Sequence, residues 1–70
     1  MEFQGQSIRM TMEDGLARVT LCQADRGNPI DATLGAELLE LSGLLMTSAR
    51  VRAVLLTAEG RFFSVGGDLN

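Results

Sequence analysis

The chain has 70 residues, 46% of them hydrophobic, and a formal net charge of −3, which argues against a nucleic-acid-binding surface. A single cysteine and the absence of histidine exclude an internal disulfide and a metal cluster of Cys and His ligands. The sequence contains neither a signal-like apolar run nor a stretch of membrane-spanning length, so we expect a cytoplasmic protein without membrane contact.

The first third of the sequence predicts an antiparallel hairpin. Ser7–Glu13 and Leu16–Leu21 each alternate apolar and polar side chains, which is typical of half-buried strands. Asp14 and Gly15 between them are the residues that a type I′ turn favours, because both positions need positive φ. The apolar face is expected to comprise Ile8, Met10, Met12, Ala17, Val19 and Leu21.

The middle of the sequence predicts a helix followed by a buried strand. A polar loop from 23 to 31 ends at Asp31, the expected N-cap. From Ala32 to about Ala49, leucines at positions 34, 38, 41 and 45 form an amphipathic stripe. Val51–Thr57 is almost continuously apolar, which predicts a strand covered on both faces in a parallel sheet. We also expect Cys22 and Met46 to be buried, and Glu37 and Glu40 to be solvated.

The end of the chain carries the most informative motif. Residues 58–61 predict a turn, Phe62–Ser64 an extended piece, and Gly66-Gly67 a sharp turn before a helix that opens at Leu69 and Asn70. Such a turn leaves N–H groups uncovered at a helix N-terminus, where they can stabilise a negative oxygen of a phosphate or an enolate. The alternative is a tight connection with Asp68 as N-cap. The segment lacks the Gly-Lys-Ser/Thr ending of a P-loop, and it lacks the Gly-x-Gly-x-x-Gly pattern of a dinucleotide-binding motif.

Residues 61–69, Arg-Phe-Phe-Ser-Val-Gly-Gly-Asp-Leu, resemble the first oxyanion-hole motif of the crotonase (enoyl-CoA hydratase/isomerase) superfamily. Residues 53–57 resemble the strand that precedes this motif, and Asn28-Pro29-Ile30-Asp31 with the following leucines resembles the family's first helix and its entry. The resemblance implies an α/β fold class, the N-terminal part of a crotonase-like ββα spiral. Residues 1–70 are then expected to be a partial domain of this kind, an N-terminal fragment.

The resemblance also implies a function. It indicates an acyl-CoA-processing enzyme, with hydration of a trans-2-enoyl-CoA as the superfamily's commonest reaction, no cofactor beyond the substrate's own coenzyme A, and a homo-oligomer (trimer or hexamer). The backbone N–H of Gly67 is implied as an oxyanion-hole donor, and Arg26 as a contact of a CoA phosphate. The implied substrate-binding residues are Arg26, Gly27, Ser64, Gly66, Gly67, Asp68, Leu69 and Asn70.

Some features depart from the family pattern and leave alternatives open. Val65 replaces the usual Ala or Ser, and Asp25 would place a negative charge beside a CoA phosphate. The family's acid and base carboxylates lie downstream of the motif, so the 70 residues alone are expected to be inactive. The alternatives are a non-catalytic, truncated or partner-dependent interaction module, and a generic phosphate-binding βαβ unit to which thioester and acyl groups would add no affinity.

Overall fold

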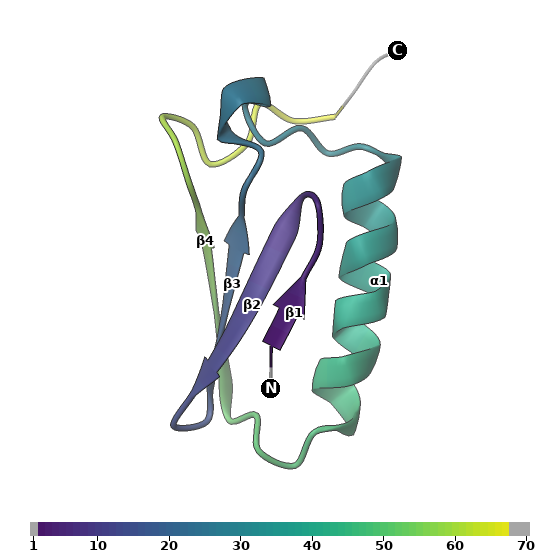
Figure 1. Cartoon of the computed structure of the whole chain (residues 1–70), viewed down its shortest axis with the longest axis vertical. Coiled ribbons are helices and arrows are strands. Elements are labelled where there is room, and N and C mark those ends of the chain that lie inside the picture. Colours follow the sequence, from purple (N-terminus) through teal and green to yellow (C-terminus); the bar gives the residue numbers. More distant parts are fainter. Residues whose placement is uncertain (1, 68–70) are drawn as a thin grey trace.

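The computed structural model describes residues 2–67 as one four-stranded sheet with a long helix beside it (Figure 1). The strands lie in chain order across the sheet, β1-β2-β3-β4. They are β1 (Glu2–Gln4), β2 (Ile8–Glu13), β3 (Leu16–Leu21) and β4 (Ala53–Ala58), with a short 3-10 turn η1 (Ala24–Arg26) and the helix α1 (Ala32–Thr47) between β3 and β4. The helix predicted to open at Leu69 and Asn70, with Asp68 as its cap, lies outside the described residues.

The predicted hairpin is confirmed. β2 and β3 pair antiparallel with Met10 opposite Val19. Asp14 (φ 52°) and Gly15 (φ 85°) between them both have positive φ, as a type I′ turn requires. The alternation places one face of both strands in the core, where five hydrophobic side chains are at most 5% exposed: Ile8, Met10, Ala17, Val19 and Leu21. A third strand, β1, which the sequence analysis did not predict, adds to β2.

Helix α1 begins where the sequence predicts. The Asp31 carboxylate accepts a hydrogen bond from the Leu34 amide at 2.9 Å, which satisfies one of the free N–H groups of the first turn. Leu34 and Leu41 are buried against the sheet. The predicted burial of Met46 is wrong, since its side chain is 86% exposed. It lies about 140° around the helix from Leu41 and so points away from the sheet.

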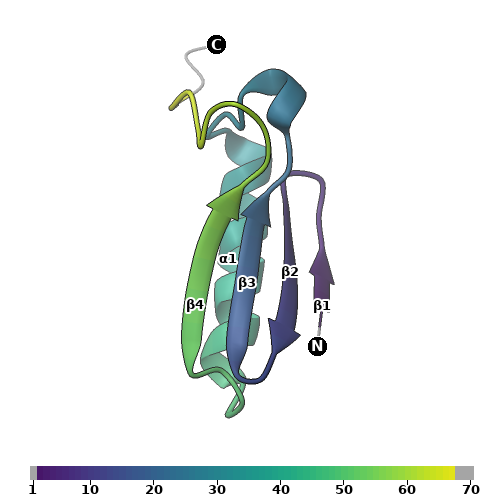
Figure 2. The ribbon, with the colours of Figure 1, turned by 90° about the vertical axis from the view of Figure 1, so that its left-hand side faces the viewer.

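Strand β4 confirms the predicted crossover, because it pairs parallel to β3 after the intervening helix. The prediction that both of its faces are covered is wrong: Val54, Leu55 and Leu56 are 53%, 40% and 51% exposed. Figure 2 shows β4 at the edge of the sheet. An open apolar cavity of about 190 Å³ separates it from α1, with Val54 and Leu56 on one wall and Leu38, Leu41 and Leu45 on the other.

The turn between β1 and β2 is tied to α1 by one carboxylate. Glu37 Oε2 accepts from the Gln6 amide at 2.7 Å, and Oε1 accepts from the amides of Ser7 and Ile8 at 2.8 and 3.1 Å. The predicted solvation of Glu37 is therefore wrong. A Cβ added to Gly5 would overlap this carboxylate, so a side chain at position 5 would require Glu37 to shift.

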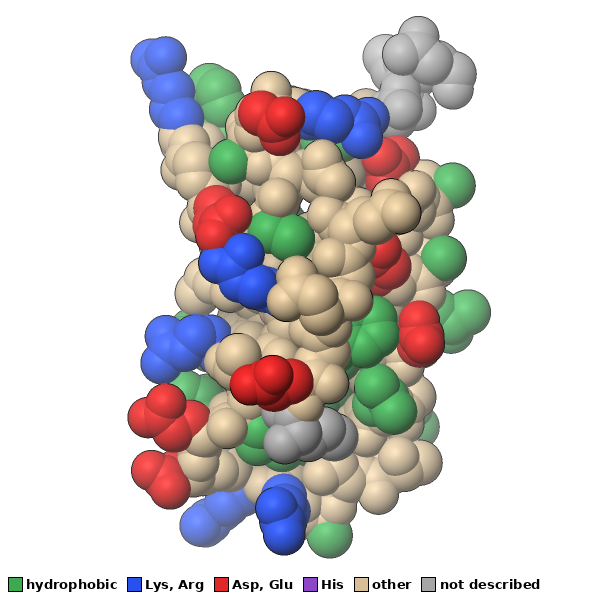
Figure 3. All heavy atoms as spheres, in the orientation of Figure 1, with side chains coloured by type: hydrophobic (Ala, Val, Ile, Leu, Met, Phe, Trp, Pro, Cys, Tyr) green, Lys and Arg blue, Asp and Glu red, His purple; other side chains and the backbone are tan. Residues whose placement is uncertain are grey.

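The described surface is mixed in character. On the face drawn in Figure 3, basic and acidic side chains are interspersed among apolar ones, without an extended basic patch. In residues 2–67 we find no helix with the length and apolar character needed to cross a bilayer.

Candidate functional site

The candidate site lies where two loops meet at one edge of the sheet. Because β3 and β4 are parallel, the segments that follow them, residues 22–31 and 59–67, leave the sheet at the same end (Figure 1). Open α/β sheets bind ligands at this carboxyl end of their strands. The Val65 amide donates to the Gly27 carbonyl, and the Ile30 amide donates to the Gly66 carbonyl, both at 2.9 Å. The two loops therefore form one unit.

The glycine turn has a backbone conformation that requires glycine. Gly66 has φ 96°, which L-residues with a side chain rarely adopt. Gly67 is exposed, and a Cβ added to it would meet no atom of residues 2–67 within 4 Å. Within residues 2–67, no acceptor takes a hydrogen bond from the Gly67 N–H. Among the described residues, this amide is therefore left without an acceptor, which is what an oxyanion-hole donor requires.

Hydrogen bonds of Ser64 and Asn28 stabilise the glycine turn. The Ser64 hydroxyl donates to the Asn28 carbonyl at 2.7 Å and accepts from the Gly66 amide at 3.0 Å. Asn28 is only 2% exposed. Sequence reasoning assigned no role to this residue, although an Asn between Gly and Pro in a polar loop is a signal for a backbone turn with side-chain hydrogen bonds.

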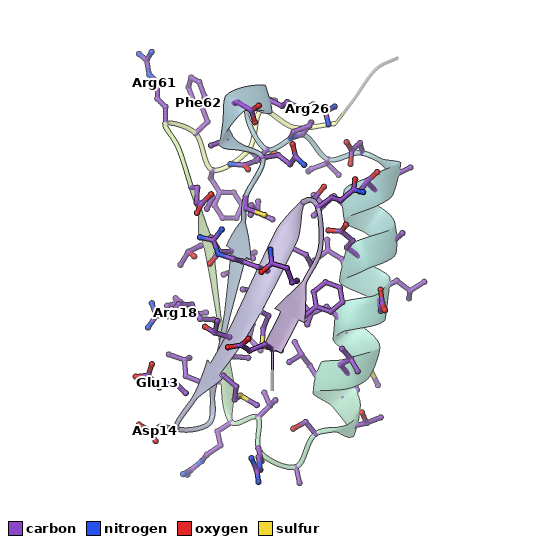
Figure 4. The ribbon with its side chains drawn as sticks, in the orientation of Figure 1. Glu13, Asp14, Arg18, Arg26, Arg61 and Phe62 are labelled. Carbon is purple, nitrogen blue, oxygen red and sulfur yellow. The ribbon has the colours of Figure 1, made fainter. Side chains whose placement is uncertain are left out.

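Arg26, the predicted phosphate contact, is already near a carboxylate. Its Nη1 lies 3.6 Å from Asp31 Oδ2, and its side chain is 53% exposed. The separation is long for a charge-assisted hydrogen bond, and the exposed guanidinium keeps donors free for a phosphate. Figure 4 shows Arg26 at the loop end of the molecule, apart from Arg61, whose guanidinium lies 5.5 Å from the centre of the Phe62 ring.

Gly27 is placed by packing against the other loop. Its φ is 78°, and a Cβ added to it would lie 2.7 Å from Val65 Cγ1. Only a glycine allows this approach, so Val65, which departs from the family pattern, is accommodated by Gly27. The structure thus brings together Gly27, Ser64, Gly66 and Gly67 of the predicted site. Asp68, Leu69 and Asn70 lie outside the described residues.

An apolar cavity of about 170 Å³ lies beside the two loops. Its lining consists of Leu21, Ile30, Leu34, Leu38, Leu56, Phe63 and Ser64. Leu38 and Leu56 also line the cavity between α1 and β4, so the two cavities adjoin. A lining with Ser64 as its one hydroxyl suits an apolar group rather than a charged one.

Four of the described carboxylates are either far from the turn or already engaged. Glu13 and Asp14 lie at the opposite end of the molecule (Figure 4). Glu59 forms an ion pair with Arg9, and Asp31 caps α1. Among residues 2–67 there is also no group of three or more His, Cys, Asp or Glu residues that could hold a metal ion.

Cys22 lies beside the Arg9–Glu59 pair and is half-buried, whereas its sequence context predicts a buried side chain. Burial raises the pKa of its thiol, and the nearby Arg9 opposes this rise only in part. Because the thiolate is the reactive form, alkylation by iodoacetamide should rise with pH around a midpoint above that of a free cysteine peptide. A rate measured against pH tests this, and a midpoint at or below that of the peptide would contradict it.

Comparison with known proteins agrees with this architecture. No family model matches the chain. The enoyl-CoA hydratase AKT6-1 of Alternaria alternata is 28% identical over 69 residues, which are 99% of this chain and 23% of that protein. The chain therefore spans about a quarter of the length of the curated relatives it matches.

Solved structures give the same result. An enoyl-CoA hydratase from Shewanella pealeana superposes with a TM-score of 0.89 at 28% identity, over 96% of this chain and 25% of that one. An enoyl-CoA hydratase/isomerase from Xanthobacter autotrophicus gives a TM-score of 0.86 at 30% identity, over 94% and 24%. The predicted resemblance to the crotonase superfamily is confirmed, and with it the α/β fold class of the N-terminal part of the crotonase-like spiral. Within this predicted fold, the burial of both faces of β4 is wrong.

Proposed function

We propose that the protein acts on an acyl-CoA thioester and that the Gly67 N–H stabilises the negative charge that develops on the thioester oxygen. The observation that carries this proposal is the open Gly67 amide, held in a glycine turn at the carboxyl ends of two parallel strands. A donor fixed before the reaction stabilises an enolate without having to reorient in the transition state. The names of the relatives, enoyl-CoA hydratases, support the same chemistry.

Hydration of a trans-2-enoyl-CoA is the specific reaction we propose. Water adds across the double bond: its oxygen bonds to Cβ, a proton goes to Cα, and the thioester oxygen carries negative charge in between. Gly67 acts on that oxygen, and Arg26 contacts a phosphate of the coenzyme A that the substrate itself brings. The acid and the base are not supplied by the described carboxylates. Residues 1–70 belong, in this proposal, to a crotonase-like domain of a cytoplasmic homo-oligomer.

An assay of hydration tests the proposal. The protein expressed from its complete gene should consume crotonyl-CoA, seen as loss of the absorbance of the unsaturated thioester, with 3-hydroxybutyryl-CoA as the product by mass spectrometry. Free crotonate should not be hydrated, because binding energy from the remote CoA is needed to orient the reacting atoms. Absence of turnover with any enoyl-CoA, together with equal affinity for CoA and for simple nucleotides, would reject the proposal in favour of a phosphate-binding unit.

A non-catalytic interaction module remains the second candidate, and one observation favours it. Val54, Leu55 and Leu56 expose large apolar side chains along an edge strand, and α1 adds Leu39 and Met46. Large apolar side chains exposed along an edge strand are typical of a surface that another polypeptide covers. The same assay separates the two candidates, since a module of this kind would not turn over enoyl-CoA.

A further inference from the structure

The geometry points to Asn28 as the positioning residue that fixes the direction of the Gly67 N–H. This inference rests on the proposed function, in which Gly67 contacts the thioester oxygen. Asn28 itself is buried and touches no substrate in the proposal. It acts through the two loops that it joins.

The Asn28 side chain forms three hydrogen bonds, one to the first loop and two to the second. Its Oδ1 accepts from the Gln23 amide at 2.8 Å in the first loop. Its Nδ2 donates to the carbonyls of Glu59 and Phe62, at 2.9 and 3.1 Å, in the loop that carries the turn. Only a primary amide offers an acceptor and two donors at this length; an aspartate would present oxygens to two carbonyl groups.

The Asn28 backbone continues the same network. Its φ of 53° lies in the left-handed region, which Asn tolerates better than most residues with a side chain. In this conformation its carbonyl accepts from the Ser64 hydroxyl, which in turn accepts from the Gly66 amide. The residues on either side complete the set, because Gly27 and Ile30 bind the backbone of Val65 and Gly66. Each of residues 64–66 therefore forms a hydrogen bond with a residue from Gly27 to Ile30.

These contacts decide where the Gly67 N–H points. The Gly66 carbonyl and the Gly67 N–H belong to one planar peptide group, and the described chain has no cis peptide bond. In a trans peptide the N–H points opposite to the C=O. Because the Ile30 amide fixes the Gly66 carbonyl at 2.9 Å, it also directs the Gly67 N–H away from Ile30. An error of about 1 Å in such a group can lower the rate about 100-fold.

Replacing Asn28 with Gly tests the inference, because glycine tolerates the positive φ while it removes the buried side chain and its three hydrogen bonds. In the protein expressed from its complete gene, Asn28→Gly should lower kcat for crotonyl-CoA hydration about 10- to 100-fold and change KM less than about threefold. Leu41→Ala is the matched control: it destabilises the core between α1 and the sheet but should leave kcat within about twofold in the folded protein. A folded Asn28→Gly enzyme with normal kcat overturns the inference.

Ser64→Ala provides a second test through the same network. It removes the hydroxyl between Asn28 and Gly66, and we expect a loss in kcat of about 10-fold. The double variant should lose less than the product of the two single losses, because both substitutions break one network. Independent, multiplicative losses would overturn the inference. If Asn28→Gly does not fold, Ser64→Ala decides alone, and an unchanged kcat overturns the inference.

Amide hydrogen exchange separates this inference from the proposed function. In Asn28→Gly, the Gly66 amide should exchange at least about 10-fold faster, while the paired amides of β2 and β3 keep their rates. Unchanged exchange at Gly66 overturns the positioning role even in an active enzyme. If the wild-type protein hydrates no enoyl-CoA, the proposed function is wrong, and Asn28 has no role in catalysis. Faster exchange then still shows that Asn28 fixes the turn.

Discussion

Replacing Gly67 with Pro should lower kcat for enoyl-CoA hydration about 10²- to 10³-fold, the usual loss for one oxyanion-hole donor. Proline has no N–H, so the substitution removes the one group that the proposed mechanism needs from this residue. The fold should survive, because no described residue accepts a hydrogen bond from the Gly67 amide. KM should change much less than kcat, since the donor acts mainly on charge that develops in the transition state.

Gly67→Ala is the matched control for this prediction. It keeps the N–H, and the added Cβ meets no described atom within 4 Å. We therefore expect turnover within about threefold of the wild-type value, from the general size of effects at sites without a steric conflict. A folded Gly67→Pro enzyme with near-normal kcat would remove the oxyanion role. Equal losses in both variants would instead show that a side chain at this position blocks the substrate.

The local part of the fold could be predicted from the sequence. The hairpin follows from alternation and from the Asp14-Gly15 turn, and the helix start follows from Asp31 as N-cap. These signals act over a few residues, so each is visible in a short window of sequence. The glycine turn is a signal of the same kind, and the structure gives Gly66 the positive φ that the motif indicates.

The contacts that join distant segments could not be predicted in this way. Asn28 binds carbonyl groups more than 30 residues away, and Glu37 binds amides about 30 residues away. Nothing in a pattern of apolar and polar residues says which buried N–H or C=O group a side chain will meet. The burial of β4 failed for a related reason: an apolar run predicts that a strand needs cover, but not where that cover comes from.

Glu37→Ala should lower the free energy of unfolding by about 2–3 kcal/mol, more than any other single change on the polar side of α1. The carboxylate accepts from three consecutive amides of the β1–β2 turn, and Ser7 and Ile8 among them are buried. An alanine leaves these donors without an acceptor, and hydrogen bonds to a charged group are the stronger ones. Alanine itself favours a helix, so the loss cannot come from helix propensity.

Glu40→Ala is the control that separates the hydrogen bonds of Glu37 to the β1–β2 turn from a general effect of charge. Glu40 lies on the same helix and is exposed, so its replacement removes the same charge without freeing a buried amide. Urea unfolding followed by circular dichroism should therefore give a change within about 0.5 kcal/mol for Glu40→Ala. The amides of Ser7 and Ile8 should also exchange faster in Glu37→Ala alone. Equal losses in the two variants would mean that net charge, rather than the contact of α1 with the turn, sets the stability. In that case the turn would have to be held by its own β1–β2 pairing, which is only three residues long on the β1 side.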